Sequence, residues 1–370
     1  MVDGRIPVVF IFGGQSGEHE ISCLTAAGVM GALDRDRFEP HGIGITREGE
    51  WVRYAADDIA ALAPVDDVLP GVETGRPRAV LLRRGDQVVL ATDRGDRLTD
   101  VTPVQVAFPL IHGPFGEDGT LQGYLEMVGL RYVGAGVAAS AVGLDKHRMK
   151  VAFAAAGLRV EPYLVRPAGA PGDLARAVAE AGLTYPVYVK PASGGSSVGT
   201  SRVDAPEGLA AAFAEAARWD PRVIIEQGVV GAREIECAVL GPAEGSRTPR
   251  ASRPGEILVR DPSGFYDYAA KYLDPDAAGL AAPADVPPSV EAEVRRLAVA
   301  AFEAIGAEGL SRVDSFVLPS GEVILNEINT MPGFTPISMF PRLWQQAGMT
   351  YAELISDLLD QALRRPLGLR

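Results

Sequence analysis

The chain has 370 residues, of which 47% are hydrophobic, so it is long enough for two or three domains with packed cores and does not belong to the intrinsically disordered class. Its formal net charge of −13 argues against a nucleic-acid binder, because contacts with phosphates require a basic surface. Cys23 and Cys237 lack metal-type spacing, and no apolar run approaches the roughly 20 residues that span a bilayer. We therefore expect a soluble cytoplasmic protein that binds neither nucleic acid nor membrane.

The first part of the chain has the pattern of a doubly wound α/β unit. An apolar strand at residues 8–12 is followed by a glycine-rich turn and a predicted helix over residues 21–33. Residues 104–111 are predicted to form a second buried strand. Residues 51–100 lie between these elements and contain only short strand-like pieces, so we interpret them as an elaboration. Together these patterns predict an N-terminal α/β domain at residues 1–134.

Two further units are predicted from the order of their elements. A central unit at residues 135–229 combines helices that end at glycines with two strands and a loop rich in glycine and serine. A C-terminal unit at residues 230–370 contains a long helix, a hairpin and a final helix. Within it, residues 253–284 are rich in Ala, Pro and Asp, and we expect them to be a loop-rich, mobile connection.

Lysine is scarce in this chain. Only four of the 35 basic residues are lysines, and the other 31 (35 − 4) are arginines. Because arginine already supplies the surface charge, each lysine is a candidate for chemistry that a planar guanidinium cannot perform. The four lysines are Lys146, Lys150, Lys190 and Lys271.

A predicted hairpin carries two carboxylates that face each other. If the turn at residues 319–322 closes symmetrically, Asp314 lies opposite Glu327, and Arg312 lies opposite Asn329. Opposed carboxylates repel, and the oxygens of Asp, Glu and Asn suit Mg²⁺, which completes its shell with phosphate and water. Arg312 could stabilise charge on a transferring phosphoryl or acyl group. The alternative is a solvated hairpin end with an ordinary Arg–Asp pair. At the turn end, the same face is predicted to carry the core-like residues Phe316, Leu318, Val323 and Leu325.

A glycine- and serine-rich loop at residues 191–199 follows Lys190, which ends a buried strand. Successive N–H groups and hydroxyls in such a loop can bind a phosphate, and a lysine can reach the same anion. The Gly-x-x-x-x-Gly-Lys-Ser/Thr motif is absent, which excludes a P-loop. A plain mobile turn is the alternative for this loop taken alone. Downstream, Glu226, Gln227 and Glu234 could accept hydrogen bonds from adenine and ribose, although solvated strand ends have the same composition.

Six motifs in chain order resemble the D-alanine–D-alanine ligase family, and the likeness extends over nearly the whole chain. Three of the four lysines fall within them, and the exception is Lys150. The first three motifs are residues 13–22, 112–123 and 144–146. The fourth combines residues 189–191 with 195–199, the fifth is residues 265–272, and the sixth combines residues 312–314 with 326–335.

The resemblance implies an ATP-grasp fold in which ATP lies between the central and C-terminal units. ATP would phosphorylate the carboxylate of one D-alanine, and the amine of a second would attack the acyl phosphate to give D-alanyl-D-alanine for peptidoglycan precursors. Two Mg²⁺ ions, which Mn²⁺ could replace, are expected, as is a homodimer. The implied metal ligands are Asp314, Glu327 and Asn329.

The resemblance also implies roles at the amino-acid sites. Glu18 would hold the ammonium of the first D-alanine, and Ser196 and Tyr272 would link to Glu18 and close a loop over the site. Arg312 and the backbone of Gly333 would stabilise the tetrahedral intermediate.

Lys271 would contact phosphate and the second substrate, whose carboxylate Ser338 would hold, and His112 is a further substrate-binding candidate. Alternatively, Glu18 could merely cap the helix that follows it, and His112 could be a turn residue. The implied nucleotide-binding residues are Lys146, Lys190, Ser196, Ser197, Glu226, Gln227, Val229, Glu234, Phe265, Lys271 and Asn326.

Three alternatives remain open at this point. Relatives that use D-lactate or D-serine change the mobile loop, whereas Lys271 and Tyr272 match the dipeptide-forming type, which favours D-alanine in both positions. Another ATP-grasp ligase or a carboxylase would share Lys190 and the hairpin but would not need Glu18. A nucleotide-sensing module without catalysis would have lost Arg312 or a metal ligand, and this chain keeps them.

Overall fold

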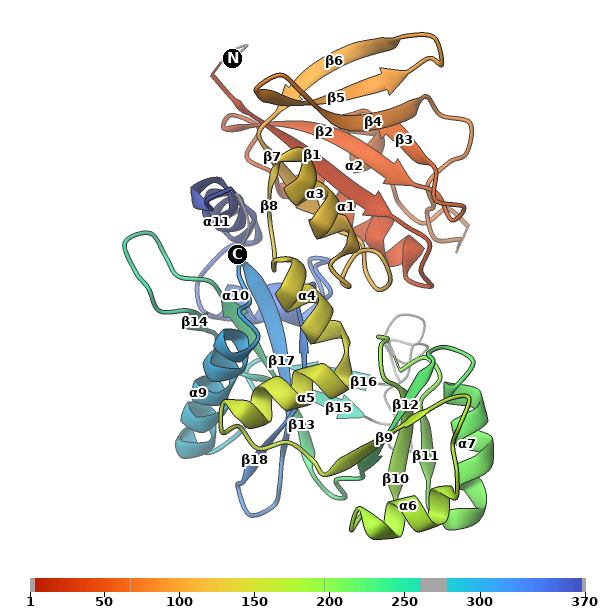
Figure 1. Cartoon of the computed structure of the whole chain (residues 1–370). Helices are drawn as coiled ribbons and strands as arrows, with labels where there is room; N and C mark the ends of the chain where they lie inside the picture. The colour runs from red at the N-terminus through yellow and green to blue at the C-terminus, as the bar shows by residue number, and fades with distance from the viewer. Residues whose placement is uncertain (1–3, 67, 196, 260–277, 368–370) are drawn as a thin grey trace.

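The computed structural model describes residues 4–66, 68–195, 197–259 and 278–367. Three β-sheets, each covered by helices, form the molecule, with the first sheet at one end and the other two at the opposite end (Figure 1). The predicted α/β class is confirmed. The boundaries proposed after residues 134 and 229 stay predictions.

The first sheet has eight strands in the order β6-β5-β4-β3-β2-β1-β7-β8. Within its parallel part, β1 (Ile6–Gly13) pairs with β2 (Phe38–Ile45) on one side and with β7 (Val106–Pro109) on the other. Alternate side chains of β1 pack on α1 (His19–Ala32) and on α3 (Thr120–Val128), so residues 8–12 are buried on both faces. Because helices cover both faces of β1, all of its side chains are apolar, and this apolar run is the pattern that predicted the strand. The remaining parallel strand is β8 (Arg131–Tyr132).

Residues 51–100 extend this sheet by antiparallel strands. They are therefore part of the N-terminal fold, as the predicted elaboration required, although their regular pairing was not anticipated. The elements are β3 (Trp51–Tyr54), α2 (Ala56–Ala60), β4 (Arg78–Arg84), β5 (Gln87–Asp93) and β6 (Leu98–Val104).

The second sheet has four strands in the order β11-β10-β12-β9. On β10 (Val187–Pro191), Val187 and Val189 are buried against the helices, whereas Tyr188 and Lys190 lie on the opposite, cavity-lining face. Helices therefore cover one face and leave the other open to a ligand. The other elements are β9 (Tyr163–Pro167), α6 (Leu174–Glu180), β11 (Ser201–Val203), the 3₁₀ turn Pro206–Gly208, α7 (Leu209–Ala216) and β12 (Arg222–Gln227).

The third sheet contains β16-β15-β13-β17-β18, with β14 beside β13. The segment at 253–284, predicted to be loop-rich, contains two paired strands, β15 and β16, because Glu256 to Val259 align with residues 278–281. Helix α9 packs on one face of this sheet. The bounds are β13 (Arg233–Leu240), β14 (Arg250–Ala251), β15 (Gly255–Val259), β16 (Ala278–Ala281), α9 (Pro288–Ala304), β17 (Leu310–Val317) and β18 (Val323–Asn329).

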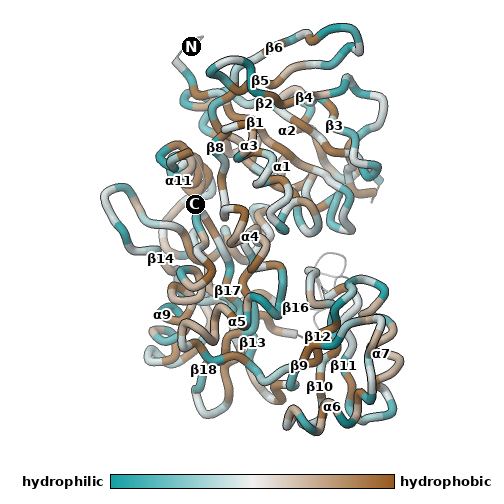
Figure 2. Tube along the Cα trace, in the orientation of Figure 1, coloured by the Kyte–Doolittle hydropathy of each residue, from teal (hydrophilic) through white to brown (hydrophobic). Residues whose placement is uncertain are grey.

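The C-terminal helices join the first sheet to the third. Helices α10 (Met339–Gln346) and α11 (Tyr351–Arg364) share one apolar core with Phe10 and Phe108 of the first sheet. The guanidinium of Arg365 then donates to the carbonyl oxygen of Gly134 at 2.7 Å. Apolar residues follow the buried strands and hydrophilic residues the surface loops (Figure 2). In the part of the chain that is described, none of the helices is both long and apolar enough to cross a membrane.

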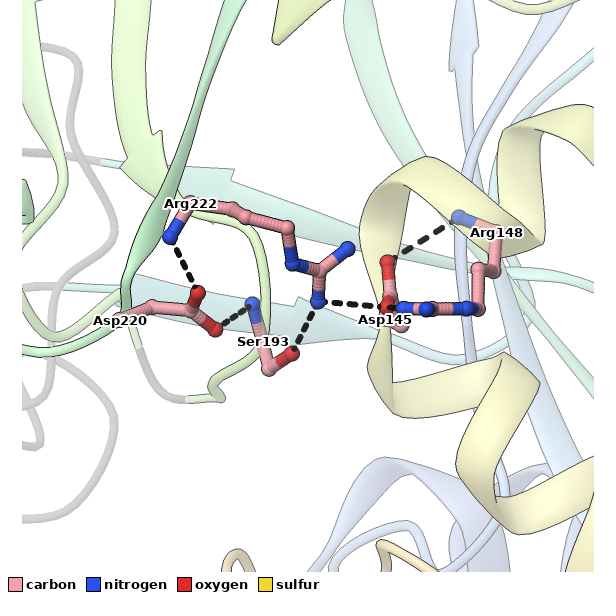
Figure 3. A network of polar contacts seen from close by, with 5 residues as sticks. All are labelled: Asp145, Arg148, Ser193, Asp220 and Arg222. Atoms are coloured by element: carbon pink, nitrogen blue, oxygen red, sulfur yellow. Dashed lines mark hydrogen bonds and ion pairs between the residues drawn. The ribbon is translucent and has the colours of Figure 1, made fainter. Parts of the chain in front are cut away.

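A charged network fixes the helix pair α4 (Val137–Leu144) and α5 (Lys146–Ala155) to the second sheet (Figure 3). Asp145 caps α5 by accepting from the backbone N–H of Arg148 at 3.1 Å, and it accepts from the guanidinium of Arg222 on β12 at 2.7 Å. Asp220 accepts from the backbone N–H groups of Ser193 and Arg222 at 2.9 and 2.7 Å. The start of α5, the loop after β10 and the start of β12 are thereby held together.

The network can be tested against a matched helix cap. Asp173 caps α6 through the N–H of Arg176 at 3.0 Å but is exposed. Asp145→Ala should lower the free energy of unfolding by about 2–4 kcal/mol, because the cap is lost and Arg222 loses a buried partner, whereas Asp173→Ala should cost about 1 kcal/mol. Urea denaturation followed by circular dichroism measures both. Equal losses would contradict a stabilising role for the network.

Candidate active site

A cavity of about 560 Å³ lies between the second and third sheets. One wall comes from β10 and β12, the other from β13, β17 and β18, and the loop at 191–199 reaches its edge. Its volume falls within the range of ligand pockets, roughly 300–1,000 Å³. Charged side chains of both signs line it, so the cavity suits a ligand that carries both anionic groups and hydrogen-bond donors.

The hairpin places its polar residues as predicted at the cavity end. Asp314 pairs with Glu327, and Arg312 pairs with Asn329. Arg312 binds both oxygens of Asp314, with Nε–Oδ1 and Nη2–Oδ2 distances of 2.7 and 2.6 Å, and lies 3.2 Å from Oε1 of Glu236 on β13. Two acidic side chains thus contact one guanidinium at the wall of the cavity.

The donor set of this hairpin fits magnesium. The side-chain N–H of Asn329 donates to Asp314 at 3.0 Å, which directs the amide oxygen of Asn329 away from that carboxylate. Among the described residues there is no group of three or more His, Cys, Asp or Glu side chains placed to hold a metal. An ion bound by Asp314, Glu327 and Asn329 would therefore need oxygens from phosphate and water, as Mg²⁺ prefers. It would also compete with Arg312 for Asp314.

The turn end of the hairpin differs from the prediction. The register shifts after Asp314, so Ser315 pairs with Leu325, and Asn326 is the extra residue of a β-bulge. The bulge turns Leu325 and Val323 to the opposite face, where they are buried against α9. The expectation that Phe316 shares a core-like face with them was wrong, because Phe316 lines the cavity. Asn326 lines the cavity as well, as a consequence of the same bulge.

Two predicted phosphate lysines lie at the cavity, each with a partner. The ammonium of Lys146, the first residue of α5, donates to the carbonyl oxygen of Gly194 at 2.6 Å. The backbone N–H of Lys146 donates to the carbonyl oxygen of Ala192 at 2.8 Å, which ties this lysine to the glycine- and serine-rich loop. Lys190 lies 2.6 Å from Oε2 of Glu226. A phosphate would have to share or replace these partners.

Glu226 and Gln227, the two residues predicted to bind adenine, differ in what their side chains contact. Glu226 is buried on β12 and lines the cavity. The Gln227 amide oxygen accepts from the backbone N–H of Thr184 at 2.7 Å, and its amide nitrogen donates to the carbonyl oxygen of Thr184 at 2.8 Å. The Gln227 side chain therefore serves the fold. Ser197, Val229 and Glu234 also line the cavity.

Glu18 and His112 lie at the first sheet, on the side facing the loop at 191–199. The side chain of Glu18 does not cap α1, and a Cβ atom at Gly195 would lie 4.0 Å from its Oε2 atom. His112 is buried, and its Nδ1 donates to the carbonyl oxygen of Met331 at 3.2 Å. The structure thus brings both residues to the region where the loop, the hairpin end and the first sheet meet.

Glu117 joins this region although it received no role in the sequence analysis. The backbone N–H of Gly113 donates to Oε2 of Glu117 at 2.6 Å. Burial, reinforced by the carboxylate of Glu18, raises the pKa of Glu117 to about 8. The protonated form, which can donate a hydrogen bond, is therefore favoured more than in an ordinary glutamate.

Other predicted residues lie farther along or outside the described chain. Gly333 follows the hairpin, and a Cβ atom there would meet the Ser338 hydroxyl at 3.3 Å. That hydroxyl accepts from the backbone N–H of Thr335 at 3.1 Å at the start of α10. The remaining predicted residues, Ser196, Phe265, Lys271 and Tyr272, lie outside the described residues.

Sequence reasoning also missed four residues that the structure places at or beside the cavity. Glu236 shares a face of β13 with Glu234, which the sequence analysis had named, so period-two reasoning could have found it. Lys150 stood out only by the scarcity of lysine. Glu161 and Arg222 carried no sequence signal, since their partners are distant in the chain.

Comparisons with known proteins agree with this geometry. The family model described as D-ala D-ala ligase N-terminus matches residues 7–135, and the model described as D-ala D-ala ligase C-terminus matches residues 153–360. The chain is 51% identical over 374 residues to the D-alanine–D-alanine ligase of Paenarthrobacter aurescens, covering 100% of this chain and 98% of the relative. The ligase of Pseudarthrobacter chlorophenolicus is 50% identical over 368 residues, covering 98% and 95%.

Solved structures give the same result. The D-alanine–D-alanine ligase from Coxiella burnetii superposes with a TM-score of 0.81 at 31% identity, covering 97% of this chain and 94% of that structure. The VanG D-Ala:D-Ser ligase from Enterococcus faecalis gives a TM-score of 0.83 at 32% identity, covering 97% and 99%. On the strength of two family models and full-length identity near 50%, this chain belongs to the D-alanine–D-alanine ligase family.

Proposed function

We propose that this chain joins two molecules of D-alanine into D-alanyl-D-alanine at the expense of ATP, which supplies the dipeptide of peptidoglycan precursors. The observation that carries the proposal is the cavity between the second and third sheets, where Lys146 and Lys190 face the acidic hairpin end. Family membership gives the reaction. A cytoplasmic location and a homodimer stay predictions.

The charges of the cavity support an ATP site with a defined orientation. Lys146 and Lys190 would bind the phosphates, with the loop at 191–199 supplying backbone N–H groups. Glu226, at the other side of Lys190, would accept a hydrogen bond from the adenine amino group. Asp314, Glu327 and Asn329 would hold Mg²⁺, which neutralises charge on the phosphates when bound.

The chain's own residues then serve the two chemical steps. Glu18 would bind the ammonium of the first D-alanine and so direct its carboxylate toward the cavity. Arg312 would stabilise the charge that develops on the acyl carbon's oxygen when the second amine attacks the acyl phosphate. The amine must lose its proton to attack, and phosphate leaves with the bonding electrons. Catalysis here consists of positioning and charge stabilisation, since no covalent intermediate with the chain is required.

The second amino acid is the point on which the relatives differ. The fold is as similar to a D-Ala:D-Ser ligase as to a D-alanine–D-alanine ligase. Lys271 and Tyr272 support D-alanine by their resemblance to the dipeptide-forming type. D-Serine is therefore the alternative nucleophile that the assay must include.

The first prediction concerns substrate dependence. With ATP and Mg²⁺, phosphate release should require D-alanine and should be absent with L-alanine or without an amino acid. Mass spectrometry should identify D-alanyl-D-alanine as the product. In mixtures of D-alanine with D-serine or D-lactate, the dipeptide of two D-alanines should dominate. A mixed product in excess would move the assignment to a D-Ala–D-Ser or depsipeptide ligase, and no release would remove the substrate assignment.

The second prediction concerns the hairpin. Glu327→Ala removes one of two carboxylates for Mg²⁺, and we expect kcat to fall by more than about 100-fold and to recover partly at high Mg²⁺. Glu322→Ala, in the exposed turn of the same hairpin, is the matched control and should keep near-normal turnover. Initial rates over a Mg²⁺ titration measure both variants. A normal rate for Glu327→Ala would contradict the metal site.

A further inference from the structure

Lys150 is the one lysine that no motif explains, and it is among the most deeply buried charged residues. Its side chain is 1% exposed on α5, and its ammonium lies 2.7 Å from Oε2 of Glu161 and 3.4 Å from Oε1 of Glu226. The ring of Tyr163 lies 5.8 Å from the same ammonium. Burying this ammonium costs desolvation free energy, which its acidic neighbours must offset.

Glu226 connects this lysine to the cavity. Its two oxygens belong to different lysines, since Oε2 accepts from Lys190 at 2.6 Å and Oε1 lies beside Lys150. Oε1 is buried and has no hydrogen-bond partner within the described residues, and the same holds for Oε1 of Glu161. Glu226 and Glu161 both line the cavity. The 3.4 Å ion pair with Lys150 leaves Oε1 of Glu226 without a short hydrogen bond, and a ligand donor could supply one.

Nucleotide binding changes the balance of this cluster. Without a ligand, the two positive charges of the lysines balance the two negative charges of the glutamates. When Lys190 turns toward a phosphate, Glu226 keeps Lys150 as its counter-ion. Without Lys150, Glu226 and Glu161 would face each other as two buried carboxylates, and one of them would take up a proton. A protonated Glu226 would be a poorer acceptor for an amino group.

We propose that Lys150 is a positioning residue of the nucleotide site, which holds the Glu226 carboxylate in place as an acceptor for the 6-amino group of adenine while Lys190 engages the phosphates. This inference rests on the proposed function. By holding Glu226 in place, Lys150 makes the site select a purine that carries an amino group at position 6.

The electrostatics agree with the geometry. Burial alone would raise the pKa of Glu226, but the ammonium groups of Lys150 and Lys190 outweigh it and hold the pKa well below its usual value. Burial alone would lower the pKa of Lys150, but Glu226 and Glu161 outweigh it and raise the pKa. Glu226 and Lys150 therefore both stay charged at neutral pH.

The test compares ATP with purine riboside triphosphate, which lacks only the 6-amino group. The ratio of their kcat/KM values should be at least about 10 in the wild-type enzyme, because a hydrogen bond to a charged acceptor is lost. In Lys150→Met the ratio should fall to about 3 or less, mainly because the KM for ATP rises. Arg250→Met removes a cation from the 2.5 Å pair with Asp357, away from the cavity, and should keep the wild-type ratio.

A double variant separates positioning from a purely structural role. Lys150→Met alone leaves Glu161 without its cation and should lower Tm, whereas Lys150→Met/Glu161→Gln removes both charges and should recover most of the loss. The nucleotide ratio should stay low in the double variant, because Glu226 still lacks the ammonium that holds its carboxylate in place.

Three possible results would separate the role proposed for Lys150 from the proposed function. A wild-type ratio in the folded double variant would overturn the proposal, because Lys150 would then serve Glu161 alone. A wild-type enzyme that is active with D-alanine but does not discriminate between the two nucleotides would also overturn it, while leaving the proposed function intact. An enzyme that makes no dipeptide but still prefers ATP in nucleotide binding would remove the proposed function and leave Lys150's role standing.

Discussion

The cavity between the second and third sheets brings charges together that cannot be buried singly. On one wall Glu226 lies between Lys190 and Lys150, and on the other Arg312 lies between Asp314 and Glu236. Each of these cations has an acidic partner, so none of them is buried as an unpaired charge when no ligand is bound. A phosphate could replace Glu226 as the partner of Lys190, and a metal ion could replace Arg312 as the partner of Asp314. The same pairing that stabilises the fold therefore prepares the site for an exchange of partners.

The backbone decides which residues join this cavity. Strand side chains alternate between faces, so Lys190 and Tyr188 line the cavity while Val187 and Val189 fill the core beneath. On β18 a single bulge adds Asn326 to the cavity wall and returns Leu325 to the core. One inserted residue thus changes the face of the sheet on which Leu325 lies, and the two strands of the hairpin stay paired.

The link between the first sheet and the cavity is carried by short polar contacts. Gly113, Glu117 and Glu18 lie near the loop at 191–199, and His112 bonds to the backbone after the hairpin. The Asp145–Arg222 pair holds the base of the loop to α5. An amino acid bound near Glu18 and a nucleotide bound near Lys190 would meet where these elements converge. This convergence, rather than any one residue, gives the cavity the form of a two-substrate site.

Local patterns in the sequence determined much of this protein, because strand alternation and turn length act over a few residues. They predicted the buried strand of β1 and the opposition of Asp314 and Glu327, whereas the family resemblance predicted that Lys146 and Lys190 share one site. The shift of Val323 and Leu325 was not predicted, because a symmetric turn gives no sign of a bulge.

Only the tertiary structure decided the partners of the buried charges. Lys150 and Glu161 are 11 residues apart, Lys190 and Glu226 are 36 apart, and Asp145 and Arg222 are 77 apart. The free energy of such pairs depends on burial and on the distance between their atoms, and neither can be read from residue type. The sequence by itself therefore predicted which groups could carry the chemistry, and the packing of the sheets decided which of them meet.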